Sequence, residues 1–185
     1  KLALKLAVSA KTDFENISYT KYQGEKSKIL VIFTEQKNMK MQNGKLFSTG
    51  NHPVEALLPM LHLKNAGFDF EIATPTGKPV IFEMWAFPEK DDQVKAIYNE
   101  YKSSFEQPKK LQDFMDTSLT ESASYAAVFV PGGHGSMLGI PEDKKVGEIL
   151  NWAHQNDLFT ISLCHGPGSF LSTTLNNQEF LYKGY

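Results

Sequence analysis

Short apolar runs alternate with helical patterns along most of the chain, and this alternation constrains the fold more than any other feature. Residues 28–33, "KILVIF", form a continuous apolar run of the kind found in parallel strands buried on both faces. Further strands are predicted at 68–73, 79–84, 125–130 and 158–163. Helices are predicted between them at 53–67, 91–106, 109–116 and 142–156, and a closing helix from about Gly166. This order predicts an α/β fold, in which helices cover both faces of a parallel sheet.

The helix at 53–67 has recognisable ends. Pro53 suits a first helical turn, and Gly67 suits a cap after the last one. Apolar residues at helical spacing predict its buried stripe: Val54, Leu57, Leu58 and Leu61.

Composition excludes several classes of protein. A chain of 185 residues has the usual length of a single domain. Its net charge of −2 gives no bulk electrostatic attraction to nucleic acid or to an anionic membrane. No apolar run approaches the length of a membrane span. The single cysteine excludes an intramolecular disulfide, so the fold needs no oxidising compartment, and we expect a cytoplasmic protein.

Two segments fall outside the simple alternation within the single domain 1–185. Residues 1–27 are expected to be an N-terminal extension that packs on the domain or lies on its surface. The opening "KLALKLAVSA" has a cleavage-like end, but Lys5 breaks its short apolar part, which disfavours a signal peptide. Residues 85–120 are too long for a simple crossover and are interpreted as an inserted helical subdomain beside the core.

In parallel sheets, sites lie at the carboxyl ends of the strands. Three loops therefore become candidates, at 34–52, 131–140 and 164–167. The last contains Cys164, which follows an apolar strand at once and precedes His165. Small residues stand two before and two after the thiol, as a nucleophile elbow demands for steric reasons. A helix N-terminus at that turn would favour the thiolate, which is the reactive form, whereas a buried core cysteine would be inert.

The other two candidate loops supply possible partners for the thiol. In "VPGGHG", Gly132 and Gly133 let backbone N–H groups approach a ligand and complete an oxyanion hole, and His134 either contacts substrate or is simply exposed. Glu55 lies in the first turn of the helix at 53–67. There it is either a carboxylate that favours the helix N-terminus or a proton shuttle beside the thiol.

Four separated motifs occur in an order that resembles the HchA-type branch of the ThiJ/PfpI superfamily: "NGKLFSTGNHPVEALLPM", "EMWAFP", "FVPGGHG" and "SLCHGPGSFL". That branch contains heat-inducible glyoxalase III and deglycase enzymes that also act as holding chaperones. The resemblance implies a flavodoxin-like three-layer sandwich, a Cys164–His165 pair, a catalytic Glu55 and a homodimer. It also implies no cofactor.

The chain departs from the family pattern in two respects. Family members often hold a metal with two histidines and a carboxylate, but the matching positions here are Lys64, Asp69 and Tyr101, so no metal site is expected. Nearby His62 is interpreted as an ordinary helix histidine. The family also continues past the position that matches Tyr185, and that remainder carries the acidic partner of the histidine. The resemblance therefore implies a fragment, and no triad acid is assigned.

The leading hypothesis is a cofactor-independent enzyme that converts methylglyoxal to lactate, removes glycation adducts from proteins or nucleotides, or does both. A cysteine peptidase or amidase shares the elbow and the Cys-His pair, although amide cleavage needs no glutamate shuttle. A stress chaperone binding unfolded clients, with an incidental thiol, and a redox sensor are the alternatives from other classes.

Overall fold

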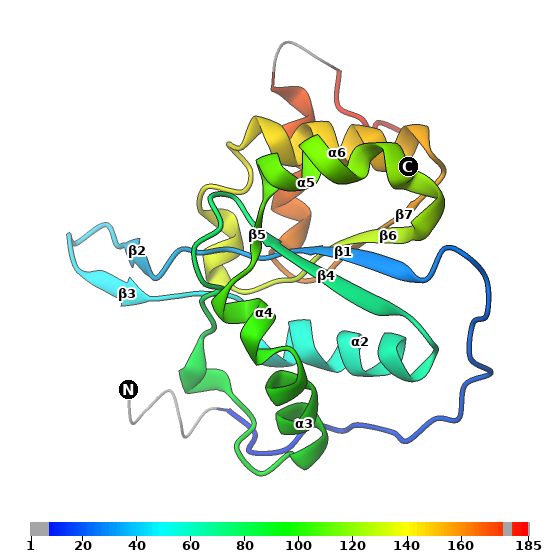
Figure 1. Ribbon diagram of the computed structural model, residues 1–185. Helices are drawn as coiled ribbons and strands as arrows, with labels where there is room; N and C mark the ends of the chain where they lie inside the picture. Colours follow the sequence, from blue (N-terminus) through cyan, green and yellow to red (C-terminus); the bar gives the residue numbers. More distant parts are fainter. Residues whose placement is uncertain (1–7, 176–178, 185) are drawn as a thin grey trace.

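Five parallel strands form the middle layer of the molecule. The computed structural model describes residues 8–175 and 179–184, and its sheet has the order β5-β4-β1-β6-β7 (Figure 1). The strands span Lys28–Ile32 (β1), Asp69–Thr74 (β4), Lys109–Lys110 (β5), Tyr125–Val130 (β6) and Phe159–Ser162 (β7). All four pairings between neighbouring strands are parallel, which confirms the sheet predicted from the alternating pattern.

Helices cover both faces of this sheet, so the expected three-layer α/β architecture is confirmed. On one side lie α2 (Pro53–Asn65), α3 (Asp92–Glu100) and α4 (Lys102–Glu106). On the other lie α5 (Leu111–Ser118) and α6 (Lys144–Gln155), with the 3₁₀ helix η4 (Gly166–Thr174) packed on α6 (Figure 1). Shorter 3₁₀ turns occur at Met84–Ala86 (η1), Leu119–Ser124 (η2) and His134–Met137 (η3).

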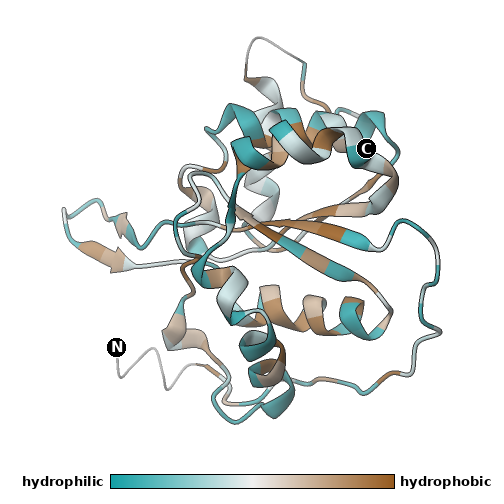
Figure 2. Cartoon of the chain, in the orientation of Figure 1, coloured by the Kyte–Doolittle hydropathy of each residue, from teal (hydrophilic) through white to brown (hydrophobic). Residues whose placement is uncertain are grey.

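The first strand shows why the sheet is buried on both faces. Ile29 and Val31 belong to the core on the α2 side, whereas Leu30 and Ile32 belong to the core on the α6 side. All four side chains are buried, because successive residues of a strand point to opposite faces. In Figure 2 the apolar residues, drawn in brown, accordingly lie on the central strands and on the inner sides of the flanking helices.

One predicted strand is wrong. Residues 79–84 form no strand of the sheet, and only a single bridge joins Phe82 to Asn51. The edge of β4 that a further strand would need is occupied by β5, with Ala73 beside Lys109. The segment is held instead by isolated backbone bonds, including those from Val80 to Phe105 and from Ile81 to Thr34.

The buried side of α2 also differs from the predicted stripe. Leu57 and Leu61 are buried as expected, but Val54 and Leu58 are only half-buried. The remaining buried positions of the helix are Pro53, Ala56 and Met60. Val54 and Leu58 instead line a hollow beside residues 8–13, because the N-terminal segment crosses that side of the helix.

The long segment between β4 and β6 is divided between both sides of the sheet. Its first part forms α3 and α4 against α2, but Lys109–Lys110 join the sheet and α5 packs on the opposite face. The helix expected at 109–116 therefore begins two residues later, at Leu111. The division of the chain into a domain with an inserted subdomain at 85–120 stays a prediction.

The hairpin in the loop after β1 was not predicted. Strands β2 (Asn38–Lys40) and β3 (Leu46–Ser48) pair antiparallel and project from the body of the molecule (Figure 1). Asn51 then returns the chain to the end of β1, where its side chain accepts from the Thr34 N–H and donates to the carbonyls of Thr34 and Ile81.

The described part of the N-terminal extension is irregular and lies along α2 and α3. Tyr22 donates its N–H to the Ala66 carbonyl, and Thr12 donates to the Asp91 carboxylate. Residues 1–7, which hold most of the signal-like stretch, lie outside the described residues. Across the part of the chain that is described, no helix is long and apolar enough to cross a membrane.

Candidate active site

Cys164 lies in the strained turn that the sequence predicts. Its φ is 51°, a left-handed value that is uncommon for a residue with a side chain. The turn is crowded, since a Cβ at Gly166 would lie 2.3 Å from the Val130 carbonyl oxygen and 2.6 Å from Ser162 Oγ. Only glycine fits there, and the turn leaves Cys164 exposed beyond the end of β7. This backbone is that of a nucleophile elbow.

The loop after β6 passes directly beside the thiol. Strands β6 and β7 are paired to their ends, with Val130 beside Ser162, so the two loops that follow are neighbours. A Cβ at Gly132 would lie 2.8 Å from Cys164 Cβ and 2.1 Å from Glu55 Oε2. The absence of a side chain at residue 132 is therefore what lets the glutamate approach the cysteine.

Gly133 is a second position that requires glycine. Its φ is 111°, and a Cβ would lie 2.3 Å from the backbone nitrogen of His52. The His52 N–H donates to the Gly132 carbonyl at 3.0 Å, which ties the loop to the start of α2. The two predicted glycines thus position the loop, whereas their role in binding an oxyanion stays a prediction.

Glu55 faces the thiol rather than solvent. Its Oε2 is buried and has no hydrogen-bond partner among the described residues. Partial desolvation of the Cys164 thiol, followed by the hydrogen bond and negative charge of Glu55, raises the pKa of that thiol. The His165 backbone N–H works in the opposite direction but is outweighed. The sequence led us to expect a thiol pKa lowered by a helix N-terminus, but desolvation and the neighbouring carboxylate raise the pKa instead.

His165 is close enough to exchange a proton with the thiol. Its Nδ1 lies 3.4 Å from Cys164 Sγ. Its ring also lies beside that of His134, with 5.0 Å between the ring centroids. The structure therefore brings Cys164, His165, His134, Glu55 and the two glycines into one region at the carboxyl ends of β6 and β7.

Glu83 is a member of this region that sequence reasoning missed. Its Oε1 lies 2.8 Å from His134 Nδ1, and its side chain is fully buried. The stretch "EMWAFP" that contains it was noticed only for its family resemblance. No local pattern distinguishes this glutamate, because its partner is 51 residues away in the sequence.

The positions that match the family's metal ligands do not fit a metal. Lys64 Nζ lies 2.9 Å from the Tyr101 hydroxyl, 3.3 Å from Asp69 Oδ1 and 3.0 Å from Glu100 Oε1. Tyr101 in turn donates to Asp69. An ammonium group thus occupies the centre of this set of oxygen atoms, where it would repel a cation.

Charge and hydrogen bonding in this cluster shift the pKa values of its members. Burial and the hydrogen bond to Asp69 raise the pKa of Tyr101 to about 12. Burial alone would lower the pKa of Lys64, but the hydrogen bonds to Tyr101 and Glu100 outweigh it and raise that pKa. Among residues 8–175 and 179–184, no three His, Cys, Asp or Glu side chains are grouped as a metal centre would require. His62 contacts Phe14 and bonds Tyr19, as an ordinary helix histidine would.

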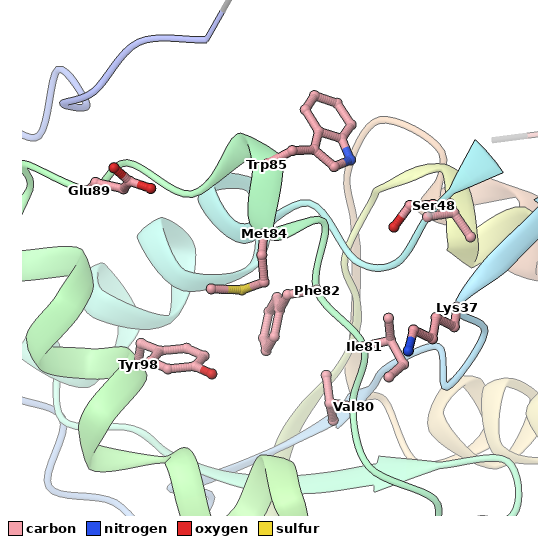
Figure 3. Close-up of a pocket in the computed structure, with 10 residues that line it drawn as sticks. Lys37, Ser48, Val80, Ile81, Phe82, Met84, Trp85, Glu89 and Tyr98 are labelled. Atoms are coloured by element: carbon pink, nitrogen blue, oxygen red, sulfur yellow. The ribbon is translucent and has the colours of Figure 1, made fainter. Parts of the chain in front are cut away.

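A wide apolar pocket of about 620 Å³ opens beside the site. In Figure 3 the side chains of Phe82, Met84 and Tyr98 point into it. None of the predicted site residues lines this pocket, so it is a separate feature from the thiol region. Phe47 connects the two, because its ring contacts both Trp85 at the pocket and His134 at the site.

A parallel sheet covered by helices on both faces, with a cysteine in a strained turn at the carboxyl end of one strand, defines an α/β protein of the flavodoxin-like fold. Residues 46–179 match the model of the DJ-1/PfpI family, and the chain belongs to that family.

Similar proteins of known description agree with this assignment. The chain is 47% identical to the protein/nucleic acid deglycase HchA of Pseudomonas aeruginosa (strain UCBPP-PA14) and 49% identical to that of Escherichia coli O157:H7 (strain EC4115 / EHEC). These matches cover 99% of the chain but only 64% of each relative. Among solved structures, glyoxalase III from Candida albicans superposes with a TM-score of 0.61 at 25% identity, covering 77% of this chain and 59% of that one.

Proposed function

We propose that this chain carries the reactive thiol of a glutathione-independent glyoxalase III that also acts as a protein and nucleotide deglycase. The observation that carries the proposal is the contact of Glu55 with Cys164 across Gly132. A thiol beside a carboxylate can form a covalent adduct with an aldehyde and then move a proton between its carbons. The descriptions of the deglycase relatives and of the Candida glyoxalase support the same chemistry.

The reaction begins at the aldehyde carbon of methylglyoxal. The Cys164 sulfur bonds to that carbon, the thiol proton passes to His165, and the aldehyde oxygen takes up a proton, so that a hemithioacetal forms. Glu55 then removes the hydrogen of the same carbon as a proton, and the bonding electrons form an enediolate. Glu55 returns the proton to the former ketone carbon and the hydroxyl proton of the adduct moves to the former ketone oxygen, which leaves a thioester of lactic acid. Water cleaves the thioester to lactate and restores the thiol.

Removal of a glycation adduct would use the same reaction steps after a different first step. The sulfur displaces the amine of a carbinolamine, the carbon–nitrogen bond breaks, and the amine leaves with a proton. The hemithioacetal that results is the one described above. Glyoxalase and deglycase activities are therefore proposed together as outcomes of one site, with no cofactor.

The remaining expectations are proposals of the same kind. We propose a cytoplasmic homodimer. Holding-chaperone activity toward unfolded proteins is supported by exposed apolar side chains on the hairpin and beside the pocket, among them Leu46 and Met84. The peptidase or amidase alternative is disfavoured by Glu55, which amide cleavage would not need.

The decisive experiment measures lactate formed from methylglyoxal in the absence of glutathione. A peptidase assay and an aggregation-suppression assay run beside it on the same protein. Lactate formation without peptide cleavage is the expected result. Peptide cleavage without lactate formation would show that the site belongs to a peptidase.

A further inference from the structure

The carboxylate of Glu83 is buried in a way that demands a partner. Its side chain has no exposed surface, and its Oε1 receives three donors. These are His134 Nδ1 at 2.8 Å, the His134 backbone N–H at 3.3 Å and Thr49 Oγ1 at 3.3 Å. Its Oε2 is buried with no hydrogen-bond partner among the described residues. Burying a carboxylate is expensive unless donors surround it, and here two of the three donors, including the one at the shortest distance, belong to His134.

The backbone holds this pair in place from both sides. Glu83 donates its own N–H to the Asn51 carbonyl at 2.9 Å, and Asn51 is bonded to the end of β1 through Thr34. Gly133, immediately before His134, is held close to the His52 backbone. The carboxylate and the imidazole are therefore attached to the same edge of the sheet as the thiol.

The contact determines which nitrogen of His134 is available to the site. Because a carboxylate accepts hydrogen bonds, Nδ1 carries a proton when it lies against Glu83. In the neutral ring the other nitrogen, Nε2, then carries a lone pair and acts as an acceptor. The His134 side chain is 41% exposed, and its ring lies beside the His165 ring, which contacts the thiol. A small substrate bound to Cys164 would lie between these rings and Glu55.

We infer that Glu83 is a positioning residue that holds His134 in the Nδ1–H form, so that the lone pair of His134 Nε2 accepts the hydroxyl proton of the substrate adduct and returns it to the neighbouring oxygen. This inference rests on the proposed function. When sulfur adds to the aldehyde, the thiol proton goes to His165, which passes it to the new alkoxide oxygen. While Glu55 then moves the carbon-bound proton, His134 Nε2 takes the hydroxyl proton of the hemithioacetal and gives it to the former ketone oxygen. Each imidazole has then returned the proton that it took up.

A double-mutant cycle tests the link between Glu83 and His134. We expect His134→Ala to lower kcat by roughly 10²-fold, the lower end of general acid–base catalysis, with little change in KM. Glu83→Gln should lower kcat through the same step, and it should have no further effect in protein that already carries His134→Ala. Independent losses that multiply in the double variant would overturn the inference. Glu148→Gln, the same change on the exposed side of α6, is the matched control and should leave kcat unchanged.

The tautomer of His134 gives a readout that does not depend on turnover. Two-bond nitrogen–proton NMR correlations should identify Nδ1–H in the wild type and a loss of that preference in Glu83→Gln. A wild type in the Nε2–H form would overturn the inference whatever the activity. If Glu83→Gln does not fold, Glu83→Asp takes its place in both experiments. Aspartate keeps the negative charge, but its shorter side chain moves the carboxylate away from His134 Nδ1. Absence of lactate formation in the wild type would overturn the proposed function, and the tautomer would then decide the positioning role.

Discussion

Glu55 and Cys164 meet in the space that any side chain at residue 132 would fill. One carboxylate oxygen of Glu55 would lie 2.1 Å from a Cβ at Gly132, and Cys164 Cβ would lie 2.8 Å from it. The two residues come from different elements, the first turn of α2 and the end of β7. Partial desolvation of the thiol and its contact with Glu55 together raise the pKa of Cys164.

Glu55→Gln should separate the two roles proposed for this carboxylate. Glutamine keeps the shape but cannot accept the carbon-bound proton, so turnover should fall by roughly 10²–10⁴-fold. Loss of the negative charge should also lower the Cys164 pKa, so iodoacetamide should alkylate the thiol faster near neutral pH. Normal turnover with a slightly lowered melting temperature would leave Glu55 a structural residue at a helix N-terminus.

Gly132→Ala should disturb the site without replacing any of the proposed reactive side chains. The added methyl would meet the Glu55 carboxylate, Cys164 Cβ and the Leu163 carbonyl oxygen, the last at 2.8 Å. We expect a large loss of turnover, and overpacking should lower the free energy of unfolding by about 1–3 kcal/mol. Gly168→Ala is the control, because the nearest atom to its Cβ would lie 3.8 Å away. Equal activity of the two variants would disprove the steric account.

Cys164→Ser should abolish lactate formation and leave the fold intact. The hydroxyl is nearly isosteric with the thiol but lacks its nucleophilic chemistry. Circular dichroism and thermal melting should match the wild type. Aggregation suppression, if the protein has it, should survive the change. Retained turnover in pure mutant protein would remove Cys164 from the mechanism.

Metal independence follows from the lysine in the position of a ligand. The Lys64 ammonium already bonds Tyr101, Asp69 and Glu100, so a chelator should leave turnover unchanged. Metal analysis of the purified protein provides the second measurement. Stoichiometric zinc that disappears on Asp69→Asn substitution would contradict the prediction.

Tyr101→Phe should reduce stability in a manner that depends on pH. The hydroxyl bonds both Lys64 and Asp69, and its loss should lower the free energy of unfolding by roughly 1 kcal/mol at pH 7. Burial alone would raise the pKa of Asp69, but the hydrogen bond from Tyr101 and the further contacts lower it. A lowered carboxyl pKa stabilises the fold above the unfolded-state value of about 3.9 and ceases to do so as pH falls through the folded-state value.

The difference in stability between wild type and Tyr101→Phe should therefore shrink on acidification from pH 7 to pH 3. Urea denaturation of both proteins at the two pH values provides the measurement. A constant difference would mean that the hydroxyl acts by packing rather than through Asp69.

The elements that sequence reasoning predicted correctly depend on neighbours close in the chain. The run at 28–33 is apolar at every buried position, so it could be assigned to a central strand without knowing its partners. The small residues around Cys164 predicted the elbow for the same reason, because Ser162 and Gly166 crowd one another within a single turn.

The errors occurred where a distant segment decided the outcome. Residues 79–84 have a strand-like pattern, but Lys109–Lys110 occupy the sheet edge next to β4. Val54 and Leu58 have the helical spacing of a buried stripe, but the N-terminal segment provides them with a separate, half-exposed environment. Periodicity predicts which residues share a face and says little about what covers that face.

Local sequence was thus sufficient for the parallel α/β architecture and the strained turn at Cys164, whereas it left Glu55 open between a helix-terminus carboxylate and a proton shuttle. Tertiary structure alone decided that Glu83 bonds His134 and that Lys64 bonds Tyr101, pairs separated by 51 and 37 residues. The physical reason is that strand and turn geometry arise from adjacent residues. The pairing of buried charges depends instead on which strand ends and loops the completed sheet brings together, and no local spacing encodes that.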